Sequence, residues 1–229
     1  MTEDRGAKGT KLPPDYAYRR RNLGLKHGID KVLAASALIA LSPFFALVAA
    51  GILSESLFRP RSRGPLIIAE VRITEGRPFP LFKFRTYYLQ DNDKQADKKG
   101  TTDFINDRDV TFLGRFLRKY YLDEVPQLFN IAQGDMSFIG PRPVPEYQYL
   151  NTLKAGYQSK RVLRAGLGGP VQALKGEWKR LGTYLVADED LVRAYGESSS
   201  LGVLGIDLKI MWRSFLKAVE GDGMEDPNR

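Results

Sequence analysis

The sequence predicts an α+β fold in which an N-terminal helix enters a membrane and is followed by a small β-hairpin and several amphipathic helices. Three observations lead to this prediction. Residues 32–53 form an apolar run of 22 residues without a charge. Strand-like segments flank Gly76, and helical periodicity appears in residues 111–132 and 206–219, each with an apolar and a basic side.

Composition limits the chemistry that this chain can perform. Its 229 residues are enough for one domain with a sizeable core. The absence of Cys and the single His exclude disulfides, iron–sulfur clusters and zinc sites that need two or more His or Cys ligands. The net charge of +8 predicts anionic partners, which are nucleic acid, acidic lipid headgroups or phosphorylated substrates.

The apolar run is long enough to cross a membrane as a helix, since a helix rises about 1.5 Å per residue and the hydrocarbon layer is ~30 Å thick. The charge of its flanks does not indicate which end of the helix is cytoplasmic. Residues 1–31 contain eight basic and four acidic residues, and residues 54–85 contain seven and three, so both flanks carry the same net charge. A hairpin that enters and leaves on the cytoplasmic side satisfies both flanks. Ser42 and Pro43 supply the break, because Pro43 cannot donate to the carbonyl of Ile39. The residues alone leave a kinked transmembrane helix equally open.

Two strands are expected at 65–73 and 79–87, joined by a turn that contains Gly76. On the second strand, the two-residue period of side chains places Lys83 and Arg85 on one face. Two cations on one face suit a phosphate, although a solvated strand face would show the same pattern.

A helix is expected to begin at Thr111, whose hydroxyl is a typical N-cap, and to break or restart at Pro126. Asp123 and Glu124 therefore lie at a helix end or a kink. Residues 206–219 combine an apolar side with basic residues at intervals of four. This pattern suits either the surface of an anionic membrane or a core-packed helix with a solvated basic edge.

The adjacent carboxylates of Asp123 and Glu124 are the leading candidates for chemistry. In a basic region they can stay ionised and divide the work, one attacking an electrophile while the other holds a divalent cation. Arg142 stands between Pro141 and Pro143, so its guanidinium can meet a phosphate with little entropy to lose. A chance acidic pair and a rigid turn are the alternative interpretations.

These residues belong to an ordered series of motifs. The series is Asp30-Lys31 before the apolar run with its central Ser-Pro, Lys83-Phe84-Arg85-Thr86, Asn106-Asp107-Arg108-Asp109-Val110-Thr111, Gly114-Arg115-Phe116-Leu117-Arg118-Lys119, Leu122-Asp123-Glu124-Val125-Pro126-Gln127-Leu128, Gly134-Asp135-Met136-Ser137 and Gly140-Pro141-Arg142-Pro143. From about Asp30 to the C-terminal helix, the chain resembles the bacterial sugar transferases, that is, the monotopic phosphoglycosyl transferases. The resemblance favours the hairpin, since in this family the apolar run is a re-entrant helix broken at Ser-Pro.

The resemblance implies an activity. The family transfers a sugar 1-phosphate from a UDP-sugar to a polyprenol phosphate, here expected to be undecaprenyl phosphate, and releases UMP. Mg²⁺ is the implied cofactor, and the reaction passes through a covalent phosphosugar-aspartyl intermediate. By motif, Asp123 is the expected nucleophile and Glu124 its metal-associated catalytic partner. Lys83, Arg85 and Arg142 are expected to bind substrate phosphates.

The expected organisation is a basic arm at 1–29, a re-entrant membrane helix at 30–56 and a catalytic domain at 57–229 with an interfacial C-terminal helix. The resemblance places this monotopic protein at the cytoplasmic face of the bacterial inner membrane, in contact with anionic lipids. It would perform the first membrane step of glycoconjugate assembly, such as exopolysaccharide or lipopolysaccharide biosynthesis, before downstream glycosyltransferases act. Nucleic acid is not expected as a partner, because no recognisable nucleic-acid module accompanies the charge. A homo-oligomer is left open.

One segment departs from the family pattern. Where the family usually has Arg-Pro-Gly-(Ile/Leu)-Thr-Gly, this chain has Arg164-Ala165-Gly166-Leu167-Gly168-Gly169, without the Pro and the Thr. The sequence therefore leaves open which sugar is transferred and in which pathway. The competing class of function is a catalytically silent, membrane-anchored scaffold that binds anionic lipids or partner enzymes through its basic surface.

Overall fold

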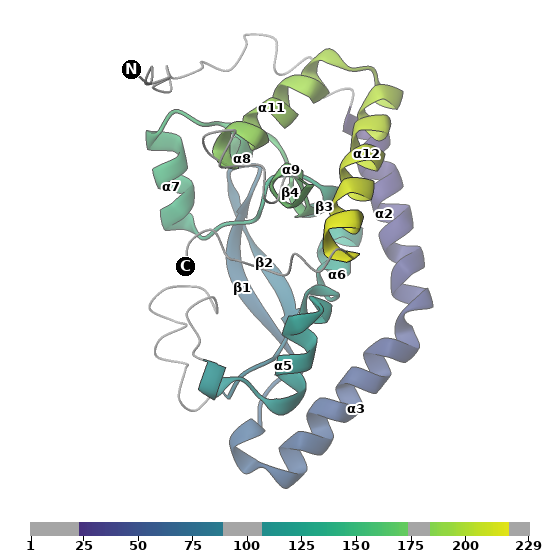
Figure 1. The fold of residues 1–229 in the computed structure, drawn as a ribbon, viewed down its shortest axis with the longest axis vertical. Coiled ribbons are helices and arrows are strands. Elements are labelled where there is room, and N and C mark those ends of the chain that lie inside the picture. The colour runs from purple at the N-terminus through teal and green to yellow at the C-terminus, as the bar shows by residue number, and fades with distance from the viewer. Residues whose placement is uncertain (1–22, 89–106, 174–183, 220–229) are drawn as a thin grey trace. The chain divides into compact units, whose positions relative to one another are not determined.

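The computed structural model describes residues 23–88, 107–173 and 184–219. These residues form α-helices and short β-strands, which confirms the α+β prediction (Figure 1). Residues 1–22, most of the expected N-terminal arm, lie outside the described residues.

The chain divides into two compact units. One contains residues 1–30, 73–77 and 135–229, and the other contains residues 31–72 and 78–134. The expected division into an arm, a membrane helix and a catalytic domain stays a prediction.

The apolar run forms two helices with a sharp bend between them. Helices α2 (Leu23–Ala40) and α3 (Ser42–Phe58) are separated by Leu41, where the helix axis bends by 58° (Figure 1). Pro43 lies in the first turn of α3, where backbone amides have no helical acceptor in any case. Among the described residues, neither helix is long and apolar enough to cross a bilayer alone, whereas the bent pair passes that test together. The break therefore occurs where Ser42-Pro43 predicts it.

Strands β1 (Ile67–Thr74) and β2 (Arg77–Phe84) form the predicted hairpin (Figure 1). Glu75 and Gly76 between them have φ angles of 46° and 76°. Two successive residues with positive φ are what a tight two-residue hairpin turn needs. Strand β2 ends earlier than expected, so Arg85 lies just beyond it.

The core of the unit formed by residues 31–72 and 78–134 lies between α3, β2 and α5 (Phe112–Lys119). Its buried apolar cluster consists of Val48, Ile52, Phe84 and Leu117. Short 3₁₀ turns, η2 (Pro60–Ser62) and η3 (Asp107–Asp109), belong to the same unit.

The predicted helix start at Thr111 is confirmed, because its hydroxyl accepts a hydrogen bond from the amide of Gly114 at 3.0 Å. Helix α5 ends at Lys119, well before Pro126. Two residues later the chain turns at Tyr121, whose backbone is left-handed with a φ of 56°. The 3₁₀ turn η4 (Leu122–Glu124) follows, and α6 (Gln127–Gln133) begins directly after Pro126. Asp123 and Glu124 thus lie between two helices, as their sequence context predicts.

The other unit contains a parallel pair of strands that the sequence does not predict. Strands β3 (Met136–Ile139) and β4 (Ala165–Gly168) pair with Met136 opposite Ala165. A Cβ on Gly166 would lie 2.2 Å from the amide nitrogen of Gly140, so only glycine fits at this point. The segment that departs from the family pattern is therefore largely a β-strand.

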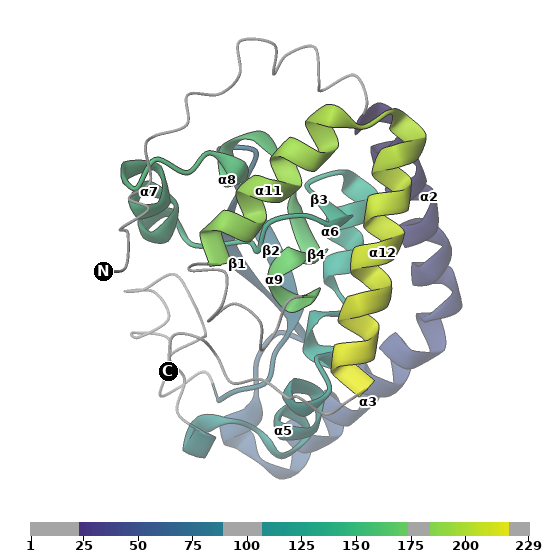
Figure 2. The same cartoon turned by 45° about the horizontal axis from the view of Figure 1, so that its top comes forward.

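Helices complete this unit. They are α7 (Glu146–Lys154), α8 (Ser159–Val162), α9 (Pro170–Ala173), α11 (Tyr184–Glu197) and α12 (Ser200–Val219). Helices α11 and α12 meet at a corner (Figure 2). Apolar side chains of these two helices form a buried core with residues of α2 and α8. On α12, Val203 is buried in this core while Leu208, Met211 and Trp212 are exposed. The C-terminal helix therefore packs one side on the core and leaves a second apolar side uncovered within the described residues.

Candidate active site

The Asp123-Glu124 pair is presented by the 3₁₀ turn η4. The two residues that flank the pair, Leu122 and Val125, pack against the apolar cluster of α3, β2 and α5. Residues three apart eclipse in a 3₁₀ turn, so Leu122 and Val125 share the buried side and the carboxylates point elsewhere. Both carboxylate side chains are partly exposed, as a reacting group must be.

Lys83 of β2 joins this pair. Its ammonium nitrogen lies 3.8 Å from Glu124 Oε1 and 4.0 Å from Glu70 Oε2. These are charge contacts rather than close hydrogen bonds. The lysine side chain is 12% exposed and that of Glu124 is 26% exposed, so the cluster opens to solvent at Glu124.

The backbone on the N-terminal side of Lys83 is fixed by α6. The side chain of Asn130, which is fully buried, accepts a hydrogen bond from the amide of Phe82 at 3.0 Å. It also donates to the carbonyl of Pro80 at 2.7 Å. Because α6 follows η4 directly, Asn130 links the strand that carries Lys83 to the turn that carries the carboxylates.

Burial raises the pKa of Asp123 to about 6. Glu124 raises this pKa as well, while Lys83 and Arg118 lower it. An Asp with this pKa is mostly ionised at neutral pH and is more basic than an ordinary Asp. Both properties suit a nucleophile.

Arg85, expected on the same face as Lys83, is buried in different surroundings. Its Nε donates to the carbonyl of Pro65 at 2.8 Å and its Nη1 to the carbonyl of Tyr87 at 3.3 Å. Burial lowers the pKa of this guanidinium, and the charge of Glu55 opposes the shift. Its Nη2 has no hydrogen-bond partner within the described part of the chain. A role for Arg85 in binding phosphate stays a prediction.

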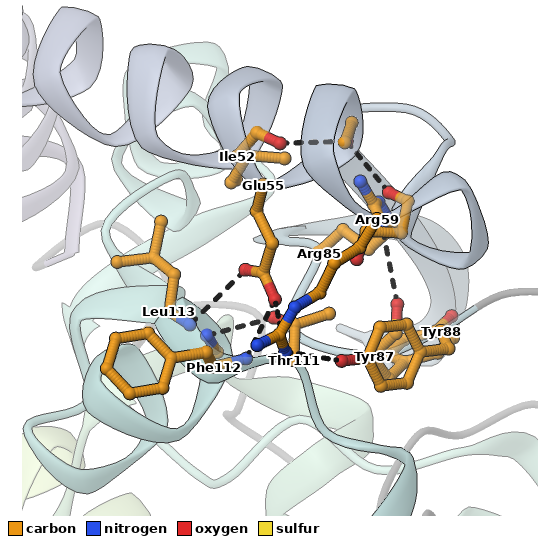
Figure 3. Close-up of polar contacts among 12 residues, drawn as sticks. Ile52, Glu55, Arg59, Arg85, Tyr87, Tyr88, Thr111, Phe112 and Leu113 are labelled. Atoms are coloured by element: carbon orange, nitrogen blue, oxygen red, sulfur yellow. Dashed lines mark hydrogen bonds and ion pairs between the residues drawn. The ribbon is translucent and has the colours of Figure 1, made fainter.

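Glu55 connects α3 to the start of α5. Its two carboxylate oxygens accept hydrogen bonds from the amides of Phe112 at 3.0 Å and Leu113 at 3.3 Å (Figure 3). These are among the amides that a helix N-terminus leaves without acceptors, and an anion is favoured there. Glu55 therefore ties the apolar helix pair to the helix that precedes η4.

The remaining predicted residues lie elsewhere. Arg142 belongs to the other unit, where it is an exposed residue in the connection between β3 and α7, and it forms no ion pair with the described residues. Its phosphate-binding role stays a prediction. Ser42 and Pro43 begin α3. The residues that the structure gathers into one site are Lys83, Asp123 and Glu124.

The two carboxylates of η4 have the donor chemistry that Mg²⁺ prefers. This ion commonly takes one or two protein carboxylates and completes its octahedral shell with water and substrate phosphates. Within the described residues, no group of three or more His, Cys, Asp or Glu gathers for a metal. The site therefore fits Mg²⁺ held jointly with a phosphorylated substrate.

The sequence alone does not single out Glu70, which the structure places beside Lys83. A signal was available in the strand itself. Glu70 and Arg72 are two residues apart in an otherwise apolar segment, so both charges fall on one face of β1.

Comparison with known proteins identifies the family. The profile of the family described as "Bacterial sugar transferase" matches residues 21–221, and the chain belongs to this family. Membership agrees with the resemblance carried by the ordered motifs.

Three relatives illustrate the range of this family. The chain is 34% identical over 157 residues to a UDP-glucose:undecaprenyl-phosphate glucose-1-phosphate transferase of Klebsiella pneumoniae, covering 66% of this chain and 31% of the relative. It is 31% identical over 182 residues to a UDP-N-acetylgalactosamine-undecaprenyl-phosphate N-acetylgalactosaminephosphotransferase of Aeromonas hydrophila, covering 73% and 37%. It is 38% identical over 133 residues to the exopolysaccharide production protein ExoY of Sinorhizobium fredii, covering 53% and 56%. The chain thus spans about a third of the length of the first two relatives and about half of the third.

Proposed function

We propose that this chain transfers a sugar 1-phosphate from a UDP-sugar to undecaprenyl phosphate and releases UMP. The observation that carries the proposal is the gathering of Asp123, Glu124 and Lys83 in one partly exposed site of a bacterial sugar transferase. The names of the Klebsiella and Aeromonas relatives support it, since each names a UDP-sugar and undecaprenyl phosphate.

The reaction is proposed to have two steps. A carboxylate oxygen of Asp123 attacks the phosphorus that bears the sugar; the bond from that phosphorus to the bridging oxygen breaks, and UMP leaves with the electron pair. A phosphate oxygen of the lipid then attacks the same phosphorus. This second step releases the carboxylate of Asp123 and leaves the sugar joined to the lipid through a diphosphate.

Lys83 is proposed to place a positive charge beside the phosphate oxygens as UMP leaves. Glu124 would hold Mg²⁺, which when bound neutralises charge on the diphosphate. Arg85 and Arg142 are retained as candidate phosphate ligands. Phosphoryl transfer depends mainly on position and charge, which is what these residues supply.

We propose that the reaction takes place at the cytoplasmic face of the inner membrane. The bent pair of α2 and α3 would enter and leave the bilayer on one side, and α3 exposes Leu47, Leu53 and Leu57 to such an environment. Single cysteines introduced at Arg20 and at Arg63 should both be labelled from the cytoplasmic side. Periplasmic labelling of either one would contradict the re-entrant topology.

The function is tested by UMP release from a panel of UDP-sugars, with purified protein, undecaprenyl phosphate and Mg²⁺. Release with at least one UDP-sugar is expected, and omission of the lipid should limit it to one turnover. Folded protein that releases no UMP from any donor would favour the alternative, a catalytically silent scaffold.

A further inference from the structure

Strand β1 has an inverted pattern of burial. Glu70 and Arg72 are buried, while Val71 between them is 60% exposed. Strands that pack on a core normally turn apolar side chains inward and charged ones outward, and buried charges are retained only when they are paired. On this part of β1, an ion pair occupies buried positions that apolar side chains would normally fill.

The buried charges form a series of ion-pair contacts that leads to Glu124. Arg72 Nη2 donates to Glu70 Oε2, and the same oxygen lies 4.0 Å from the ammonium of Lys83. Lys83 in turn lies 3.8 Å from Glu124. Positive and negative charges alternate from the interior to the partly exposed carboxylate.

Two constraints act on Lys83 in this arrangement. The hydrogen bonds of Asn130 to Phe82 and Pro80 fix the backbone near Lys83. Glu70 acts on the far end of the same side chain, which has four rotatable bonds and would otherwise lose considerable entropy on being ordered. Glu70 is itself constrained, because Arg72 donates a hydrogen bond to the same carboxylate oxygen that faces Lys83.

We propose that Glu70, held by Arg72, is a positioning residue that keeps the ammonium of Lys83 at the reacting phosphate. The inference rests on the proposed function and deepens it. Glu70 acts through Lys83 and forms no bond to the substrate. Its contribution should therefore appear in the rate of the chemical step, with substrate binding little changed.

The test compares Glu70→Gln with Glu70→Gln/Arg72→Met. The double variant removes both buried partners, so that no unpaired guanidinium is left to unfold the protein. Both variants should release UMP about 10- to 100-fold more slowly at saturating UDP-sugar, the range expected when a catalytic group is displaced by about 1 Å. The KM for the UDP-sugar should change by less than about twofold.

A double-mutant cycle with Lys83→Met isolates the mechanism. Formation of the phosphosugar adduct is followed over hours by intact mass, so that slow variants can be compared. Because Glu70 acts through Lys83, adding Glu70→Gln to Lys83→Met should cause no further loss. Full multiplication of the two losses would overturn the inference.

Asp188→Asn is the matched control, because Asp188 is a buried carboxylate paired with Lys160 at 2.7 Å in the other unit. It should lower the melting temperature while leaving kcat and KM of the folded fraction unchanged. Wild-type kinetics in both Glu70 variants, beside an active parent enzyme, would overturn the positioning role alone. A parent that releases no UMP from any donor would overturn the proposed function and the inference together.

Discussion

Each of the two units contains a buried cluster of charges, and the two clusters are built differently. In the unit that contains α12, Lys26 lies 2.5 Å from Asp207 and 3.3 Å from Asp30. The hydroxyl of Ser137 donates to Asp30 at 2.5 Å, and that of Tyr195 donates to Asp207. These four contacts are hydrogen bonds, and the side chain of Lys26 is almost fully buried.

In the unit that contains η4, the contacts of Lys83 with Glu70 and Glu124 are 4.0 and 3.8 Å long. Glu124 is partly exposed, and Asp123 beside it has a pKa raised to about 6 by burial. A closed cluster in which hydrogen bonds are short ties elements together. A cluster that is partly exposed, as this one is at Glu124, can be reached by a substrate. Distance and exposure, rather than charge, therefore distinguish the two clusters.

The largest effect is expected in the open cluster. Asp123→Asn should reduce UMP release by at least about 10³-fold, because the amide has nearly the shape of the carboxylate but is a very poor nucleophile. Folding should not suffer, since burial raises the pKa of Asp123 and the charged form is therefore disfavoured in the folded protein. Steady-state assays together with thermal unfolding check both statements. An active Asn variant would remove Asp123 from the reaction.

The closed cluster should respond in stability. Lys26→Met leaves the carboxylates of Asp30 and Asp207 buried without their cation, and the expected loss is about 3–5 kcal/mol. Thermal unfolding should show a melting temperature lower by about 10 °C. Lys31→Met, at an exposed position of the same helix, is the control and should change stability by less than about 0.5 kcal/mol. Equal stability of the two variants would contradict a structural role for the cluster.

Glu124→Gln should act on metal dependence. The variant loses the negative charge of a carboxylate proposed to bind Mg²⁺, while the attacking carboxylate of Asp123 remains. Turnover should therefore fall about tenfold, and more Mg²⁺ should be needed for the half-maximal rate. A titration of Mg²⁺ with UMP release as the readout measures both. A variant with unchanged Mg²⁺ dependence would separate Glu124 from the metal.

The pH dependence follows from Asp123. Since the pKa of Asp123 is raised to about 6, the attacking carboxylate is protonated below that pH and ionised above it. The initial rate of adduct formation should therefore rise about tenfold per pH unit below 6 and level off above it. A rate that stays constant down to pH 4 would contradict this account.

The smallest effect concerns the backbone before the pair. Tyr121 has a φ of 56°, a conformation that glycine adopts without strain. Tyr121→Gly should therefore raise the free energy of unfolding by about 0.5–1 kcal/mol. Tyr120→Gly is the control, because Tyr120 has a φ of −110° and gains nothing from glycine. Equal changes in the free energy of unfolding of the two variants would show that relief of backbone strain at Tyr121 is not the cause.

Local rules predicted much of the fold. A proline at the centre of an apolar run, a glycine between two strands and a threonine before an apolar-basic helix each act within a few residues. The break before Pro43, the hairpin at Gly76 and the cap at Thr111 are accordingly confirmed. Strands β3 and β4 escaped prediction because they are four residues long, do not alternate, and pair across a long separation in the chain.

The candidate site was predicted in part for the same reason. Asp123 and Glu124 stand out because an acidic pair before a proline is a local pattern, and the structure adds Lys83 to them. The buried guanidinium of Arg85 is surrounded by the carbonyls of Pro65 and Tyr87 and by the charge of Glu55. The alternation of side chains along a strand does not predict these neighbours. Glu70 lies on β1 of the predicted hairpin, but its contact with Lys83 depends on side-chain burial that the sequence did not single out.

Intact-mass measurement shows whether Asp123 forms the proposed covalent bond to the phosphosugar. Purified protein is incubated with Mg²⁺ and a UDP-sugar that it accepts, without lipid, and its mass is compared with that of Asp123→Asn. We expect a mass increase of one phosphosugar on the parent protein, loss of this increase when undecaprenyl phosphate is added, and no increase on the variant. A parent protein that turns over with lipid but never gains mass, or a variant that still gains it, would exclude Asp123 as the covalent nucleophile.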